Sequence, residues 1–283
     1  MNLSDYKTVE SLLKKAGFSF KKSLGQNFLI DSSVCPKMAE ASCDKECGVI
    51  EIGPGIGVLT KELSKCAKKV VAIELDERLK KILPVTLADC DNVQVIYGDA
   101  LKLDLHKIIA EHFSDCSDVC ICANLPYYIT SPIVMSLLES KLPIKSITVM
   151  VQKEAAERLC AEVGSRDAGA VTVAVTYYAE KEILFEVARE SFMPTPNVDS
   201  AVIQLTIRPA PPISVNNEEK FFKLVKACFA QRRKTLVNTV SNTLGIEKEL
   251  LRNAISQIGL IDTVRSEQLT IEQLAQLSNI IYQ

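Results

Sequence analysis

The sequence of 283 residues predicts an α/β fold with a mostly parallel sheet, followed by a small all-helical region. From Gly48 onward, short apolar runs typical of buried strands alternate with helical patterns, as in a parallel sheet with helices on both faces. The run Pro209-Ala210-Pro211-Pro212 then marks a boundary, and the segments after it have helical spacing. We therefore expect two domains, residues 1–210 and residues 211–283.

Composition limits the class of protein. With 47% hydrophobic and 24% charged residues, the chain has the material for a sizeable core. Its apolar runs are far too short to span a membrane, and its amino terminus lacks the apolar centre of a signal peptide. We expect a cytoplasmic protein that does not contact membranes, and nothing in the sequence indicates more than a monomer.

Ten cysteines raise the question of a metal site or of disulfides. No C-x-x-C pair is present, and His106 and His112 do not stand at zinc-ligand spacing from the cysteines. We expect most of the thiols to be small buried hydrophobic groups that stay reduced, and we expect no metal.

Charge is nearly balanced overall, at −2, but two segments are basic. Residues 1–30 hold five lysines against two acidic residues, and residues 218–236 hold six basic residues against two acidic ones. Either segment alone is explained by a solvated helix face. Together, in an otherwise acidic chain, they indicate that the protein binds a polyanion at these segments.

The chain begins with the apolar spacing of a short amphipathic helix over residues 4–16. A polar stretch with one glycine follows at residues 21–29, and the next helix should be capped near Asp31 or Ser32.

The first strand of the alternating region, residues 49–52, leads into Gly53-Pro54-Gly55-Ile56-Gly57 and then a helix. Glycines here supply positive φ angles and let the backbone approach a ligand, which the first N–H groups of the helix would face. A dehydrogenase has G-x-G-x-x-G for its pyrophosphate. The spacing G-x-G-x-G after Glu51 instead suits a ligand without pyrophosphate, such as S-adenosylmethionine, although a plain strand-to-helix turn has similar residues.

Acidic residues follow the next two predicted strands. Residues 70–75 contain Glu74, placed to accept hydrogen bonds from ribose hydroxyls, and residues 93–96 lead to Asp99, which could accept from an adenine amine. Each acid alone could be a surface carboxylate. Their occurrence at successive strand ends, after the glycine turn, indicates one binding site at the carboxyl edge of the sheet.

The apolar run at residues 119–123 ends in Asn124-Leu125-Pro126-Tyr127. An amide oxygen and a turn carbonyl can accept the two protons of an amine on a flat ring, and an aromatic face can stack on that ring. We therefore expect this turn to hold the acceptor of the reaction.

Beyond this turn we expect a helix over residues 130–139 capped by Thr130 or Ser131, a strand at 144–151 and a helix at 153–161. The segment 170–178 remains open, because its alternation favours a strand whereas the family named below has a helix there.

Residues 182–187 and 198–207 should form an antiparallel pair, joined by a loop that two prolines stiffen. Phe192 in this loop could be a wall of a base pocket or a core aromatic. The last helix should begin at Thr270, with Gln273 as its capping-box partner.

Seven motifs occur in the order seen in the rRNA adenine N6,N6-dimethyltransferases, and the chain resembles this family from about residue 20 onward. The motifs are L-G-Q-N-F-L at 24–29, E-I-G-P-G-I-G at 51–57, I-E-L-D at 73–76, G-D-A at 98–100, N-L-P-Y at 124–127, F-M-P-T-P-N-V-D-S at 192–200 and F-A-Q-R-R-K-T-L at 229–236. The Q-R-R-K segment and the helical tail favour the branch that modifies two adjacent adenines in a hairpin near the 3′ end of small-subunit rRNA.

The resemblance implies a Rossmann-like class I methyltransferase fold with a seven-stranded sheet, S-adenosylmethionine as cofactor, and the immature small ribosomal subunit as partner. It implies two groups of site residues. Those expected to bind the cofactor are Asn27, Leu29, Gly53, Gly55, Glu74, Asp99 and Asn124. Those expected to carry catalysis and hold the adenine are Asn124, Leu125, Pro126 and Tyr127. From the basic segments and the proline-stiffened loop, we further expect RNA to be contacted by Phe192, Lys21, Lys22, Arg232, Arg233 and Lys234.

Four other interpretations compete with this one. They are a large-subunit rRNA adenine dimethylase of the antibiotic-resistance type, a DNA adenine methyltransferase with a similar Asn-x-Pro-Tyr motif, an RNA-binding assembly factor with little catalysis, and a dehydrogenase. The glycine spacing disfavours the last of these.

Overall fold

The structure, a computed structural model, describes residues 3, 6–15 and 28–283. It divides into two compact units. The first comprises Met1–Ala156 and Glu182–Ile207, and the second comprises Glu157–Lys181 and Arg208–Gln283. The second unit therefore includes a segment from the middle of the chain, which a boundary placed by sequence at residue 210 does not capture.

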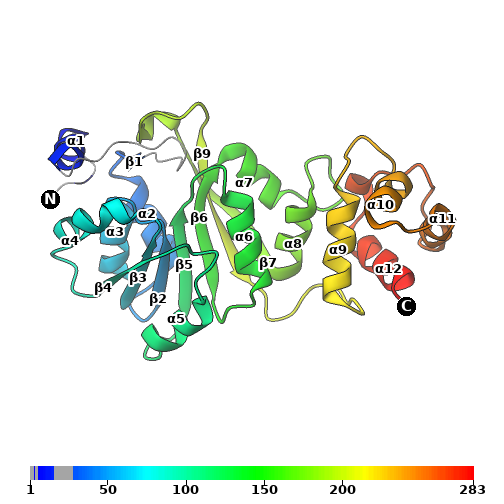
Figure 1. Ribbon diagram of the computed structural model, residues 1–283, viewed down its shortest axis with the longest axis horizontal. Helices are drawn as coiled ribbons and strands as arrows, with labels where there is room; N and C mark the ends of the chain where they lie inside the picture. The colour runs from blue at the N-terminus through cyan, green and yellow to red at the C-terminus, as the bar shows by residue number, and fades with distance from the viewer. Residues whose placement is uncertain (1–2, 4–5, 16–27) are drawn as a thin grey trace. The chain divides into compact units, whose positions relative to one another are not determined.

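One seven-stranded sheet forms the centre of the first unit, in the order β4-β3-β2-β5-β6-β9-β7 (Figure 1). Its strands are β2 (Gly48–Ile52), β3 (Lys69–Glu74), β4 (Val93–Tyr97), β5 (Val119–Asn124), β6 (Ser146–Gln152), β7 (Ala179–Val187) and β9 (Ser200–Ile207). The pairs β4–β3, β3–β2, β2–β5 and β5–β6 are parallel, and β9 is antiparallel to β6. The predicted α/β fold with a mostly parallel seven-stranded sheet is confirmed.

Strand order determines where a ligand can bind. Because β2 lies between β3 and β5, the order in which strands are added reverses at β2. The last residue of β2, Ile52, pairs with Ile73 on β3 and with Ala123 on β5. The turns that follow these three strands therefore meet at one edge of the sheet, which is the usual place for a ligand in an open α/β sheet.

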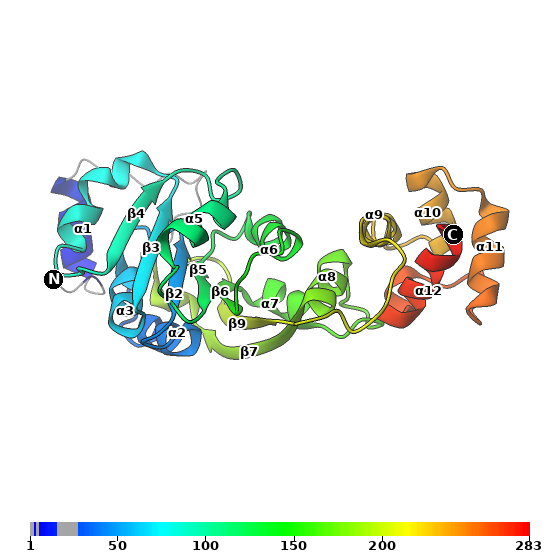
Figure 2. The same ribbon diagram turned by 90° about the horizontal axis from the view of Figure 1, so that it is seen from below.

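Helices cover both faces of the sheet. α2 (Val34–Ser42) and α3 (Val58–Cys66) bury Met38 and Leu63 against strand residues such as Val49 and Cys122. Figure 2 shows α5 (Leu105–His112) and α6 (Thr130–Glu139) on the opposite side of the strands. No helix in the described ranges combines the length and the apolar character needed to cross a bilayer.

The amino-terminal helix predicted over residues 4–16 is confirmed as α1 (Tyr6–Lys15). Its Val9 is fully buried and belongs to the same apolar cluster as Ile56 of the glycine turn and Leu83 of α4 (Leu83–Thr86). The short 3₁₀ helix Glu77–Lys81 precedes α4. Through this cluster, α1 packs against the glycine turn.

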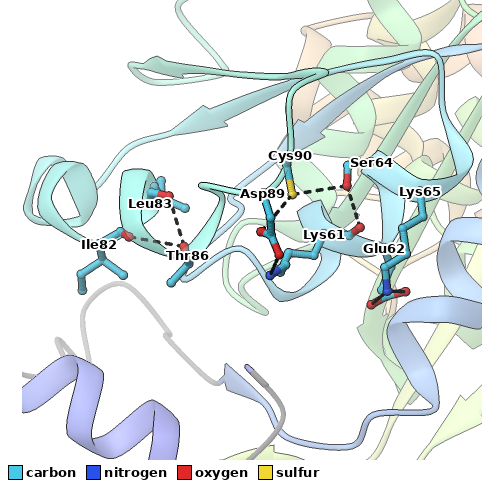
Figure 3. Close-up of polar contacts among 9 residues, drawn as sticks. All are labelled: Lys61, Glu62, Ser64, Lys65, Ile82, Leu83, Thr86, Asp89 and Cys90. Carbon is cyan, nitrogen blue, oxygen red and sulfur yellow. Dashed lines mark hydrogen bonds and ion pairs between the residues drawn. The ribbon is translucent and has the colours of Figure 1, made fainter. Parts of the chain in front are cut away.

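Polar contacts join α3 to the segment after α4 (Figure 3). Lys61 Nζ lies 2.9 Å from Asp89 Oδ2, and Ser64 Oγ donates to Cys90 Sγ at 3.4 Å. The Lys61 side chain is largely covered, and the ion pair links the segment after α4 to α3, which begins directly after the glycine turn.

A second, two-stranded sheet joins distant parts of the chain. β1 (Phe28–Leu29) pairs antiparallel with β8 (Phe192–Met193), so that Leu29 is opposite Phe192. The 3₁₀ helix Arg189–Ser191 precedes β8, and Ile30 N donates to the Ser191 carbonyl at 2.8 Å. The sequence did not predict this pairing.

The second unit is mainly helical. Its helices are α8 (Ala170–Tyr178), α9 (Glu218–Cys228), α10 (Leu236–Leu244), α11 (Lys248–Gln257) and α12 (Ile271–Ile281), with a 3₁₀ helix at Ser266–Gln268; α7 (Lys153–Cys160) begins in the first unit and ends in the second. The predicted capping box of the last helix is confirmed, because Thr270 Oγ1 accepts from Gln273 N and Gln273 Oε1 accepts from Thr270 N.

The segment left open by the sequence is a helix, α8. Gly169 N donates to Thr172 Oγ1 at 2.9 Å at its start, and Tyr178 Oη donates to Glu218 Oε1 of α9 at 2.8 Å at its end. Contacts with α9 and burial of most side chains outweigh the preference of Val and Thr for strands.

The cap predicted for α6 is wrong. The residue before the first helical turn is Ile129, and Thr130 is already helical. The Thr130 hydroxyl donates back to the Pro126 carbonyl at 3.4 Å, so it belongs to the preceding turn.

Candidate active site

The glycine turn connects β2 to α3 through backbone angles that few other residues adopt. Gly53 and Gly55 have φ angles of 73° and 57°. Gly53 N donates to the Ile73 carbonyl of β3 at 2.9 Å, which fixes the start of the turn to the neighbouring strand. The turn is therefore held by the sheet, and Gly53 and Gly55 line a cavity at the carboxyl edge.

Glu74, the last residue of β3, is 6% exposed and its carboxylate faces the glycine turn. Oε2 accepts from Gly55 N at 3.1 Å and Oε1 accepts from Asp76 N at 2.7 Å. Burial raises the pKa of this carboxyl above its ordinary value, and the two backbone N–H groups partly offset that effect. A carboxylate can accept about four hydrogen bonds, so acceptor positions remain for a ligand in the cavity.

Asp99 follows β4 and lines the same cavity. Its Oδ1 accepts from Leu101 N at 3.0 Å, which holds the carboxylate in the turn after the strand. The side chain is 30% exposed and lies 3.6 Å from Lys102 Nζ, so it remains accessible.

The turn Asn124 to Tyr127 follows β5. Leu125 is 1% exposed, and its N–H donates to the Met150 carbonyl of β6 at 3.1 Å. The Pro126 carbonyl accepts from Ile129 N at 3.1 Å and from the Thr130 hydroxyl. Within residues 28–283, no backbone N–H outside the regular helices and strands donates to the Leu125 carbonyl. The turn is thus closed by hydrogen bonds to the Pro126 carbonyl, and the Leu125 carbonyl remains for another donor.

Tyr127 is partly buried, and its hydroxyl lies 2.9 Å from Ser200 Oγ at the start of β9. Burial raises the pKa of the Tyr127 phenol, so the ring carries no charge near neutral pH. The neighbouring Tyr128 is 59% exposed.

Phe192 fits both interpretations given for it. It is 2% exposed and belongs to a core cluster with Leu29 and Met150, yet it also lines the cavity.

The structure brings most of the predicted site residues of the first unit around one cavity. The predicted residues that line it are Leu29, Gly53, Gly55, Glu74, Asp99, Asn124, Leu125, Pro126, Tyr127 and Phe192. Asn27, Lys21 and Lys22 lie outside the described residues. Arg232, Arg233 and Lys234 belong to the second unit, in an exposed turn between α9 and α10.

Sequence reasoning missed the contribution of Glu51 to the cavity wall. This residue on β2 is 1% exposed and lines the cavity, and among the described residues its Oε2 has no hydrogen-bond partner. Burial raises its pKa to about 8, and the nearby Thr60 hydroxyl lowers it in part, although among the described residues that hydroxyl also has no hydrogen-bond partner within normal distance. An acidic residue inside an otherwise apolar strand is the sequence signal that could have identified it.

The lining suits a ligand with an apolar body and positive charge. Leucine, isoleucine and methionine side chains form much of the wall, and four carboxyl groups, those of Glu51, Glu74, Asp76 and Asp99, lie among them. The unpartnered buried oxygen of Glu51 is the observation that fits a ligand ammonium, because such a group would supply the missing donor. S-adenosylmethionine, with an ammonium, a sulfonium and an adenosine, fits these acceptors and the apolar wall around them.

The described residues contain no group of three or more His, Cys, Asp or Glu side chains placed to hold a metal ion. All ten cysteines are free thiols, and Cys35, Cys47, Cys120, Cys122 and Cys228 are buried. Burial raises the pKa of Cys120 to about 11 and that of Cys228 to about 12, so these thiols are protonated.

A mostly parallel seven-stranded sheet, with a glycine turn after β2 and acids after the next strands, defines this chain as a class I S-adenosylmethionine-dependent methyltransferase. The family model for ribosomal RNA adenine dimethylase matches residues 17–283, and the chain belongs to this family.

Relatives and solved structures agree with that assignment. The ribosomal RNA small subunit methyltransferase A of Geobacillus thermodenitrificans (strain NG80-2) is 52% identical over 96% of this chain and 94% of the relative. The protein of the same name from Bacillus pumilus (strain SAFR-032) is 50% identical over the same shares. A dimethyladenosine transferase from Plasmodium falciparum has a TM-score of 0.72 at 28% identity, covering 88% of this chain and 95% of that chain. The 23S rRNA methyltransferase ErmE has a TM-score of 0.66 at 27% identity, covering 90% of this chain and 100% of that chain.

Proposed function

We propose that this protein transfers two methyl groups to the N6 amine of each of two adjacent adenines in a hairpin loop near the 3′ end of small-subunit rRNA. The observation that carries the proposal is the meeting of the glycine turn, Glu74, Asp99 and the Asn124 turn around one cavity. The names of the relatives that are 50% and 52% identical support the small subunit as the source of the RNA.

S-adenosylmethionine supplies an electrophilic methyl carbon on a sulfonium. On the protein side, Glu74 would accept from the ribose hydroxyls, Asp99 from the adenine amine of the cofactor, and Glu51 from its ammonium. Asn27 and Leu29 complete the proposed cofactor-binding set. Charge-assisted hydrogen bonds of this kind contribute roughly 1.5–3 kcal/mol each.

The Asn124 turn would orient the target amine. An adenine N6 is a poor nucleophile because its lone pair is shared with the ring. If the Asn124 side-chain oxygen and the Leu125 carbonyl accept its two protons, the nitrogen can become pyramidal and direct its lone pair at the methyl carbon. The use of the Pro126 carbonyl within the turn leaves the Leu125 carbonyl for this task.

Positioning would carry most of the rate. Holding the nucleophile and the methyl carbon in line can remove roughly 7–11 kcal/mol of a barrier, and stacking of a base on Tyr127 can contribute about 1–3 kcal/mol. The adenine must leave its stack to enter the cavity, so an unpaired loop adenine needs the least energy.

The basic residues would hold the RNA backbone. Arg232, Arg233 and Lys234 are exposed in one turn, and the Arg232 guanidinium donates to the Arg166 carbonyl, which adds an exposed cation beside them. Lys21 and Lys22 would act similarly from the amino-terminal segment. Such contacts give affinity and register without reading sequence. A monomer acting on the immature small subunit in the cytoplasm completes the proposal.

In the experiment, the purified protein is incubated with S-adenosylmethionine that carries a labelled methyl group. One of three acceptors is added: small subunits from cells lacking the protein, large subunits from the same cells, or duplex DNA. Label in small-subunit rRNA alone supports the proposal. Label mainly in large-subunit rRNA would show a large-subunit dimethylase instead, and label mainly in DNA would show a DNA adenine methyltransferase. Binding to small subunits without transfer would indicate an assembly factor.

A further inference from the structure

The contact between Tyr127 and Ser200 links the cavity wall to a strand that is far from Tyr127 in the sequence. Tyr127 belongs to the turn after β5, and Ser200 is the first residue of β9. Their hydroxyl oxygens are 2.9 Å apart, and Ser200 is fully buried, at 0% exposure. A buried hydroxyl needs a hydrogen-bond partner, and here that partner is the hydroxyl of Tyr127, whose side chain belongs to a residue of the cavity wall.

Ser200 is itself rigidly placed. It pairs with Gln152 in the β6–β9 ladder, and the Asp199 carbonyl accepts from Lys153 N at 3.0 Å. The Asp199 carboxylate accepts from Arg189 N at 3.0 Å, which holds the start of the loop that carries Phe192. The position of Ser200 Oγ is therefore set by the sheet and by the loop together.

A hydrogen bond to a tyrosine hydroxyl constrains the ring in a particular way. The hydroxyl lies on the long axis of the ring, so the bond fixes the direction of that axis and leaves only rotation about it. Leu125 N fixes the other end of the turn to β6 through the Met150 carbonyl. The turn is thus held to β6 by the Leu125 backbone and to β9 by the Tyr127 hydroxyl.

We propose that Ser200 is a positioning residue for methyl transfer, which sets the Tyr127 ring against the target adenine and keeps the Asn124 turn in register with the Phe192 loop. This inference rests on the proposed function. Ser200 makes no contact with the reacting atoms in this account and acts only through Tyr127. Its loss should slow the transfer step without changing how the cofactor binds.

The test compares Ser200→Ala, Tyr127→Phe and the double variant as full-length proteins, with small subunits from cells lacking the protein as substrate. Each single variant should lower kcat about fivefold, the effect of one neutral hydrogen bond. The double variant should lose no more than either single variant, because both changes remove the same bond. Affinity for S-adenosylhomocysteine, measured by calorimetry, should remain that of the wild type.

Ser146→Ala is the matched control. Ser146 is also a buried serine, 5% exposed, at the opposite end of the β6–β9 pair, where it is opposite Thr206. Its replacement should leave kcat unchanged, whereas a merely structural role for Ser200 predicts that both serine variants shift the melting temperature and neither slows transfer by a folded protein.

Three results would overturn the inference: wild-type kcat in Ser200→Ala, wild-type kcat in Tyr127→Phe, or losses that multiply in the double variant. If Ser200→Ala does not fold, Tyr127→Phe alone decides, because it removes the same bond at a partly exposed position. A wild-type protein that transfers no methyl group to small subunits would overturn the proposed function and this role with it. An active wild type with an equally active Ser200→Ala would overturn only the role of Ser200.

Discussion

Glu51 makes the stability of the free protein depend on pH in a defined direction. Burial raises the pKa of this carboxyl to about 8 in the folded protein, from an ordinary value of 4.5. Between these two values the folded protein binds more protons at this group than the unfolded chain does. The free energy of unfolding contributed by Glu51 therefore falls as pH rises through this window and becomes constant above it.

The perturbation is Glu51→Gln, which keeps the shape of the side chain and removes its titration. At 1.36 kcal/mol per unit of pKa difference, ionisation of Glu51 lowers the wild-type free energy of unfolding by about 3 kcal/mol between about pH 5.5 and about pH 8.5. The variant cannot ionise at this position, so its free energy of unfolding should not fall in this way. The difference in the free energy of unfolding, variant minus wild type, should therefore increase by about 3 kcal/mol over the same pH range.

The assay is urea denaturation of both proteins without cofactor at several pH values, where the other titrating groups cancel in the difference. Glu157→Gln, the same change at an exposed position, is the control for the chemistry of the substitution itself. A pH-independent difference for Glu51→Gln would refute the reasoning, since it would mean that Glu51 is ionised in the folded protein throughout this range.

Three further predictions concern binding and transfer. Asn124→Ala should leave cofactor binding largely in place and lose methyl transfer, because it removes an acceptor for the target amine; calorimetry and labelled transfer measure the two, and wild-type turnover would exclude the proposed role. Glu74→Ala should weaken cofactor binding by about 10²-fold or more, from two lost charge-assisted hydrogen bonds, and Glu74→Gln by less; unchanged affinity in a calorimetric titration would contradict the ribose contact. Changing Arg232, Arg233 and Lys234 together to Ala should weaken RNA binding and lower the slope of log affinity against log salt by about two, from three lost phosphate contacts; an unchanged slope would place the turn away from RNA.

Local patterns were enough to predict much of this fold. The glycine turn, the acids at or just after the ends of β3 and β4, and the capping box at Thr270 each depend on residues close together in sequence, so spacing alone indicates them. The parallel sheet then follows from the alternation of strands and helices, and parallel strands place their carboxyl ends at one edge.

Contacts between distant residues were beyond that reasoning. Tyr127 and Ser200 are 73 positions apart, and Leu29 and Phe192 meet only because β1 pairs with β8. The grouping of 157–181 with the carboxyl-terminal helices has the same origin, because α8 is held by α9 through Glu218. The α6 cap was misplaced because the Thr130 hydroxyl serves the preceding turn instead of the helix.

Mass mapping of rRNA tests the assigned reaction most directly. Small-subunit rRNA is isolated from cells that lack this protein and from the same cells carrying either the wild-type gene or the Asn124→Ala variant. The account predicts two adjacent adenines near the 3′ end that are each dimethylated with the wild type and unmodified in the other two samples. The same two adenines dimethylated in cells without the protein, or methyl groups that depend on it only in large-subunit rRNA, would contradict the account.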